Sequence, residues 1–267
     1  MLHLEKLLIY LEMFLVNIKN QTLRLITIGI ILSTTISCHT HLVLSKENVS
    51  QRKIDSTIIS DEAITAYYLP YKKSLDSSMN AILVYSNEEL TKAQPESKLS
   101  NFFSDAISAT CKQRKIAFDF ALPTTNGGIR TSLPKGAITL RNAFELMPFE
   151  NELVVLYLPG SSITKLAQFI IEKGGQPVSN FILEVKGDSI STLLINNQPL
   201  ELTKTYRVLT SDYLANGGDG IIAFKDAIKK ENTNIKVRDA IIEYMRNEQS
   251  AGRTLNPMLD GRIKIEK

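Results

Sequence analysis

Apolar residues recur at helical spacing in three segments of the chain. Positions three and four apart share one helix face, so these segments predict three amphipathic helices. The first covers residues 99–110, the second opens at Ser162 and ends at Gly174-Gly175, and the third covers residues 237–245. All three lie beyond residue 60, so we expect this part of the chain to fold around a hydrophobic core.

Short β-type segments separate these helices. Five are predicted as strands: residues 118–122, 153–158, 181–185, 191–195 and 206–210. A turn at Lys186-Gly187-Asp188 joins the third and fourth into a hairpin, and Thr139 caps a short predicted helix over residues 140–146. Helices and strands interleave without a strict βαβ repeat. We therefore predict an α/β (α+β) fold, a single mixed-sheet domain with flanking helices.

The first 60 residues have a different pattern. Residues 23–37 form a short apolar run around Arg24, and a small residue, Ser37, directly precedes Cys38. A basic flank and an apolar stretch shorter than the ~20 residues of a membrane span are the layout of a secretory signal. We predict a bacterial lipoprotein signal peptide over residues 1–37, with Cys38 as the lipidated N-terminus that anchors an exported protein to the membrane.

Alternatives remain open at this end of the chain. Thr35 stands where lipoprotein cleavage sites usually carry Leu, so a simple N-terminal anchor helix is the competing interpretation. Met13 would begin a more ordinary signal peptide than Met1 does. Residues 38–60 are polar and predict a tether, and residues 61–267 form the predicted domain.

Composition narrows the classes of function. The 267 residues are 43% hydrophobic and 22% charged, which is enough apolar material for a sizeable core. The formal net charge is only +3 and no basic stripe is present, so we expect no nucleic-acid partner. The histidines, His3, His39 and His41, all precede residue 61. Nucleophilic triads need a base and zinc sites usually recruit imidazole, so we expect neither catalytic residues nor a metal site in the domain.

Two glycine-rich loops carry the candidate chemistry. One surrounds Arg130 and the other surrounds Asp219. Glycine lets a backbone approach a ligand closely, so we expect both side chains to be presented rather than packed. Phe149 and Tyr213 add aromatic rings beside turns, and Asn151 adds an amide. An arginine, an acid, two aromatic rings and an amide together suit a nucleotide.

Each of these residues also has a structural interpretation. Arg130 could close a surface turn, and Asp219 could cap a helix over residues 220–228, because Asp is a favoured N-cap. Phe149 and Tyr213 could belong to the core, as most aromatic side chains do. The residues alone leave both interpretations open.

Short motifs occur in a recognisable order along the chain: residues 99–106, 126–130, 147–151, 158–160, 213–220 and 261–263. In this order they resemble the C-terminal domain of the 5′-nucleotidase family of secreted metallophosphatases, from about residue 64 to residue 263. In that family this domain binds the substrate, and an N-terminal domain carries two metals and performs the hydrolysis. The resemblance also places Asn126 among the substrate-binding residues.

The resemblance implies a role for each of the other candidate residues. Phe149 and Tyr213 would sandwich the base, with Tyr213 in the place of a usual Phe. Asp219 would accept hydrogen bonds from the ribose hydroxyls, and Asn151 would contact the base edge. Arg130 would face the phosphate, because its planar fork suits phosphate oxygens.

Two departures from the family weaken the expected phosphate clamp. Family members usually carry Asn where this chain has Thr125, and they often carry Arg where Pro95 precedes Glu96. Lys98 could partly replace the missing guanidinium. We therefore expect this chain to retain more of the family's nucleoside-binding residues than of its phosphate-binding residues.

Only the predicted signal and tether precede residue 64, so the sequence leaves no room for the family's catalytic domain. We therefore expect a split 5′-nucleotidase. This lipoprotein would bind the 5′-nucleotide, and a separate metallophosphatase with divalent metal ions would hydrolyse the phosphomonoester in nucleotide catabolism. A non-catalytic nucleotide-binding lipoprotein of the cell surface is the alternative.

Overall fold

The computed structural model describes residues 6, 8–10, 12, 13, 16, 21, 25, 26 and 50–266. By its internal contacts the chain divides into two units, residues 1–59 and 60–267. Most of the predicted signal peptide, the predicted lipidation site Cys38 and residues 39–49 of the predicted tether lie outside the described residues. Among the helices that are described, none combines the length and the apolar character needed to cross a membrane.

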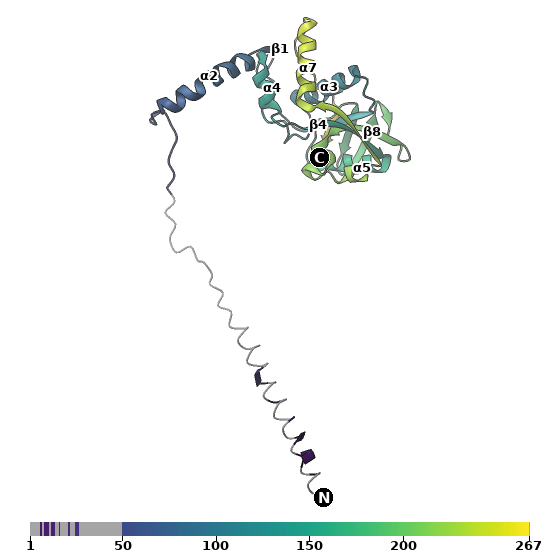
Figure 1. The fold of residues 1–267 in the computed structure, drawn as a ribbon. Coiled ribbons are helices and arrows are strands. Elements are labelled where there is room, and N and C mark those ends of the chain that lie inside the picture. The colour runs from purple at the N-terminus through teal and green to yellow at the C-terminus, as the bar shows by residue number, and fades with distance from the viewer. Residues whose placement is uncertain are drawn as a thin grey trace. The chain divides into compact units, whose positions relative to one another are not determined.

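A four-stranded sheet in the order β2-β8-β4-β9 organises the second unit (Figure 1). Its strands are β2 (Phe120–Leu122), β4 (Glu152–Pro159), β8 (Thr205–Ser211) and β9 (Lys229–Lys236). β8 pairs in parallel with β2 and antiparallel with β4, which in turn pairs antiparallel with β9. β9 was not predicted, because its sequence is polar. It lies at an edge of the sheet, where polar and charged side chains are usual.

Successive side chains of β4 alternate between two hydrophobic clusters, one on each face of this sheet. Leu153 belongs to one cluster and Val154 to the other, and the alternation continues to Leu158. Helices cover both faces, with α3 and α7 on one side and α5 on the other (Figure 1). Their bounds are Lys98–Gln113 for α3, Gly160–Glu172 for α5 and Val237–Ser250 for α7. Burial on both faces explains why residues 153–158 are continuously apolar.

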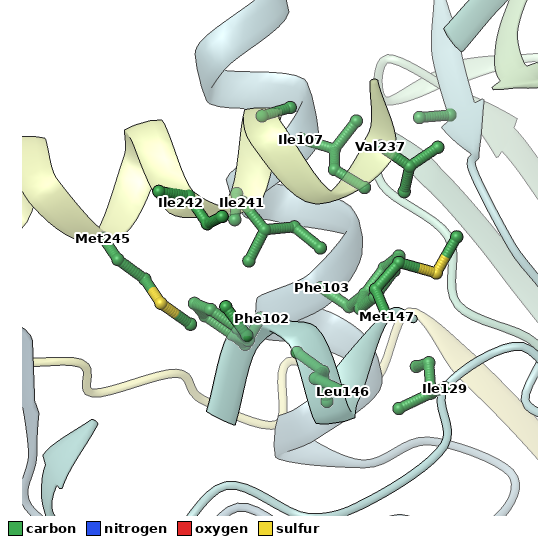
Figure 2. Close-up of a cluster of buried hydrophobic side chains, with 14 of the residues drawn as sticks. Phe102, Phe103, Ile107, Ile129, Leu146, Met147, Val237, Ile241, Ile242 and Met245 are labelled. Carbon is green, nitrogen blue, oxygen red and sulfur yellow. The ribbon is translucent and has the colours of Figure 1, made fainter. Parts of the chain in front are cut away.

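The interface between α3 and α7 forms much of the first cluster. Figure 2 shows Val237, Ile241 and Met245 of α7 lying over Phe102 and Phe103 of α3. Each of these five side chains is at most 3% exposed. The three predicted long helices are therefore confirmed, and so is the short helix α4 (Leu140–Leu146).

A smaller four-stranded sheet has the order β10-β5-β6-β7. Its strands are β5 (Phe181–Lys186), β6 (Ser189–Ile195), β7 (Gln198–Pro199) and β10 (Ile263–Glu266). β5 and β6 form the predicted hairpin, and β10 pairs in parallel with β5. The fold is thus mixed α/β with mixed sheets and flanking helices, as predicted.

The segment before α3 is more regular than its sequence indicates. Helix α2 (Glu62–Met79) begins after its N-cap Asp61 and buries none of its side chains. An ion pair between Asp76 and Arg141, at 2.6 Å, joins it to α4. Because it buries no side chain, α2 has little tertiary packing within the described residues.

A two-stranded antiparallel sheet is formed by β1 (Ile82–Ser86) and β3 (Gly136–Thr139).

We expect Phe103→Ala to lower the free energy of unfolding by about 3–5 kcal/mol, because it opens a cavity at a side chain that is 0% exposed. Leu75→Ala on α2, where the side chain is 54% exposed, should change it by less than about 0.5 kcal/mol. Urea denaturation of the two variants measures both values. If both variants lowered the free energy of unfolding equally, the description of α2 as a helix with little tertiary packing would be contradicted.

Candidate functional site

The topology of the central sheet brings the two glycine-rich loops together. The first loop, residues 125–130, lies shortly after the end of β2, and the second, residues 211–220, begins at Ser211, the last residue of β8. These strands are parallel neighbours, so their carboxyl ends lie at the same edge of the sheet. β4 is antiparallel to β8 and pairs Leu153 with Ser211, so the segment that enters β4 reaches this edge as well.

A cavity of about 320 Å³ lies where these three segments meet. It is lined by Thr124, Gly127, Gly128, Arg130, Met147, Phe149, Asn151, Ser211, Tyr213 and Asp219. Five of the six predicted substrate-binding residues are therefore brought together. Asn126 is the exception, because its amide nitrogen donates to the carbonyl of Gly175 at 3.0 Å and it does not line the cavity. Its contacts support the first loop.

Asp219 lies in the short 3-10 helix η1 (Gly218–Gly220) in a left-handed conformation, with φ 54°. The N-cap of η1 is Gly217 and that of the next 3-10 helix, η2 (Ile222–Asp226), is Ile221. The interpretation of Asp219 as a helix cap is therefore wrong. Its carboxylate instead accepts hydrogen bonds from the hydroxyls of Tyr213, at 2.9 Å, and Thr125.

The two aromatic side chains are not part of the core. Phe149 is 40% exposed and Tyr213 is 50% exposed. A Cβ atom at Gly218 would lie 2.5–2.6 Å from three ring carbons of Tyr213, so the ring packs directly against glycine backbone. Arg130 places its guanidinium carbon 5.7 Å from the centre of the Phe149 ring. The arginine therefore lies beside the aromatic part of the cavity in this structure.

Asp212, at the start of helix α6 (Asp212–Ala215), was missed as a supporting residue. Its Oδ1 accepts hydrogen bonds from the side-chain nitrogen of Asn151 at 3.0 Å and from the backbone nitrogens of Glu152 and Tyr213. One carboxylate thus fixes the Asn151 amide relative to the segment that carries Tyr213. The available signal was an acid in the first turn of a helix, a common and unspecific feature.

Arg238 was also missed, and it supports the turn that carries Phe149. The residue is 4% exposed, and Nη1 donates to the carbonyl oxygens of Met147 and Phe149, both at 3.2 Å. Its guanidinium also pairs with Glu150, which binds Lys236 as well. A charged residue next to the apolar positions of α7 was the only hint in the sequence.

The model of the 5′-nucleotidase C-terminal domain family matches residues 78–226, more than half of the chain. The chain belongs to this family. It is similar to a trifunctional nucleotide phosphoesterase of Bacillus subtilis (27% identity, 82% of this chain, 16% of the relative) and to rat 5′-nucleotidase (27%, 79% and 42%). A solved 5′-nucleotidase precursor from Thermus thermophilus matches at 26% identity with a TM-score of 0.64, over 77% of this chain and 43% of that one. The chain spans less than half the length of each.

Lys98 and Glu96, the charged residues near Pro95, are both engaged in contacts away from the cavity. Lys98 pairs with Glu88 at 2.6 Å, so the expectation that it partly replaces an arginine is not supported by its contacts. Glu96 accepts hydrogen bonds from the backbone nitrogens of Asp260 and Gly261 and thereby joins the start of α3 to the C-terminal segment. Among the described residues that line the cavity, Arg130 alone is positively charged.

The family is associated with metallophosphatase activity, which depends on bound metal ions. Within residues 50–266 and the few described positions before them, no group of three or more His, Cys, Asp or Glu side chains is arranged to hold a metal ion. The described residues therefore supply no ligand set for a metal ion.

The turn that carries Phe149 should be sensitive to acid. Hydrogen bonds from Lys236 and Arg238 lower the pKa of Glu150 from 4.5 to about 2. A carboxylate whose pKa is lowered by folding contributes its stability above pH 4.5 and loses it as the pH falls towards 2.

We therefore expect Glu150→Gln to lower the melting temperature by a constant amount above pH 5, and the difference from the unmodified protein to shrink as the pH falls from 4.5 towards 2. Thermal melts across this range measure the difference. Glu145→Gln, at an exposed carboxylate of α4, is the charge-matched control. A difference in melting temperature that stays constant down to pH 2 would contradict a stabilising contribution from the ion pairs of Glu150 with Lys236 and Arg238.

Proposed function

We propose that this chain is the nucleotide-binding half of a split 5′-nucleotidase. It would bind the base and ribose of a 5′-nucleotide and present the phosphate to a metallophosphatase domain that belongs to a separate protein. The observation that carries the proposal is one cavity that combines two exposed aromatic rings, an amide, a carboxylate and an arginine in a member of this family.

The chemistry of the cavity suits a nucleoside. Phe149 and Tyr213 offer ring faces for a base, and Asn151 offers a polar amide for its edge. Asp219 accepts hydrogen bonds and therefore suits the donor hydroxyls of a ribose. Arg130 supplies a planar set of donors for phosphate oxygens, once it leaves the ring of Phe149.

The chain's contribution to the reaction would be binding and orientation. Divalent ions on the metallophosphatase would activate the attacking water and stabilise charge on the phosphate. Interactions with base and ribose that are equally strong before and in the transition state lower KM only. Holding the phosphate at the correct angle to the separate centre would raise kcat.

The N-terminal residues extend the proposal to location. The apolar run of residues 23–37 and the Ser37-Cys38 pair support export and lipid attachment at Cys38, followed by the tether over residues 38–60. The domain over residues 61–267 would then be held at the membrane of a bacterium. A binding lipoprotein that does not take part in hydrolysis is the second candidate, and it is favoured by the aromatic, amide and carboxylate side chains of the cavity, which can bind a nucleoside without a metal centre.

Adenosine and AMP are expected to bind the purified protein. The variants Tyr213→Ala and Asp219→Ala should each weaken the binding of adenosine. For Tyr213→Ala the loss of stacking corresponds to about 5- to 150-fold in Kd. Isothermal titration calorimetry measures the constants. Tyr67→Ala on α2 and Asp188→Ala in the β5–β6 turn are matched controls, because both are exposed and far along the chain from the cavity. If neither Tyr213→Ala nor Asp219→Ala changes the affinity for adenosine, the assignment of the binding site is wrong.

The purified protein should release no phosphate from AMP, with or without added Mg²⁺, Mn²⁺ or Zn²⁺, because the described residues hold no metal-ligand cluster. A colorimetric assay for inorganic phosphate checks this, with a two-metal phosphatase as positive control. Phosphate release that disappears on addition of a chelator would place the catalytic centre in this chain and contradict the division of roles.

A further inference from the structure

We propose that the hydroxyl groups of Tyr213 and Thr125 are positioning groups, which hold the carboxylate of Asp219 ready to receive the two neighbouring hydroxyls of a ribose. The inference rests on the proposed nucleotide site. It is carried by the observation that one side chain from each glycine-rich loop donates to the same carboxylate.

The two hydroxyls act on different oxygens of Asp219. Tyr213 donates to Oδ1 at 2.9 Å, and Thr125 donates to Oδ2. Among the hydrogen bonds of the described residues, the carboxylate accepts no others. An ionised carboxylate has about four acceptor positions, two on each oxygen. One position therefore remains on each oxygen, which matches the two donors of a ribose diol.

Tyr213 is itself held in place on several sides. Its backbone nitrogen donates to Oδ1 of Asp212 at 2.7 Å, and its ring packs against the backbone of Gly218. A ring fixed in this way can orient its hydroxyl while its free face remains available for stacking. The same side chain would thus serve the base through its ring and the ribose indirectly, through Asp219.

Thr125 is the more deeply buried of the two donors. It is 5% exposed, and its carbonyl accepts a hydrogen bond from the backbone nitrogen of Gly128 at 3.0 Å. Thr125 therefore belongs to the rigid turn of the first loop, whereas Asp219 belongs to the second. Its hydroxyl joins the two loops directly at the carboxylate. This contact restrains a residue that already adopts a left-handed backbone conformation.

The two donors leave acceptor capacity on the carboxylate for a ligand. Each hydroxyl occupies one of the about two acceptor positions on its oxygen. Because they are divided between Oδ1 and Oδ2, both bonds can persist while ligand hydroxyls bind. Preorganised groups bind more tightly because their ordering cost is met before the ligand arrives. Loss of either hydroxyl should therefore weaken binding of the ribose.

The test compares two ligands, adenosine and 2′,3′-dideoxyadenosine, by calorimetry on the full chain. Tyr213→Phe keeps the ring and removes the hydroxyl, and Thr125→Val does the same for the threonine while Thr125→Ser keeps a hydroxyl. We expect Tyr213→Phe and Thr125→Val each to raise the Kd for adenosine by about 2- to 10-fold and to leave the Kd for the dideoxynucleoside unchanged. Thr125→Ser should retain adenosine binding. Thr192→Val is the matched control, because it removes a threonine hydroxyl that donates to the carboxylate of Glu184 in the smaller sheet.

The outcomes separate this inference from the proposed function. If Asp219→Ala weakens adenosine but Tyr213→Phe and Thr125→Val do not, the nucleoside site stands and the positioning role is wrong. Equal losses for both ligands would indicate a structural role, and tighter adenosine binding would indicate that the hydroxyls compete with the ligand; either result overturns the inference. If Asp219→Ala changes nothing, the proposed site itself is wrong.

Discussion

The main-chain pairing of β8 with both β2 and β4 is the constraint on which the candidate site depends. Parallel pairing with β2 places the two glycine-rich loops at one edge of the sheet, and antiparallel pairing with β4 brings the Phe149 segment to the same edge. Both faces of these strands are buried, so their register cannot slip without moving apolar side chains out of the two clusters. The geometry of the cavity is therefore set by the core of the protein.

Around this frame, most polar contacts near the cavity support loops. Asp212 fixes Asn151, Arg238 holds the carbonyls of the Phe149 turn, and Thr125 joins the two loops through Asp219. Loops that bind ligands lack the packing that orders a core, so such supports determine how well a site is formed before binding. The cavity has a well-supported aromatic and carboxylate part, and Arg130 is the one cation among its described lining residues.

Sequence patterns predicted the elements that are buried and missed those that are not. α3, α5 and α7 were found because their apolar residues follow helical spacing. β9 is polar and forms through its backbone at an edge, and α2 buries no side chain, so neither carries a hydrophobic signal. Five of the six candidate site residues share one cavity because they were chosen from loops rather than from apolar runs. Asn126 does not line the cavity, and its contacts with Gly175 and Gln176 could not be foreseen because these residues are distant in sequence.

The sequence by itself determined which residues form the core, which loops carry exposed chemistry and to which family the chain belongs, because periodicity and short motifs are local properties. Only the tertiary structure decided that Tyr213 and Thr125 share the carboxylate of Asp219, that Lys98 is occupied by Glu88 and that Arg238 lies beneath the Phe149 turn. These contacts join residues from separate loops, strands and helices. They are produced by strand pairing and helix packing, and hydrophobic spacing along the chain does not encode them.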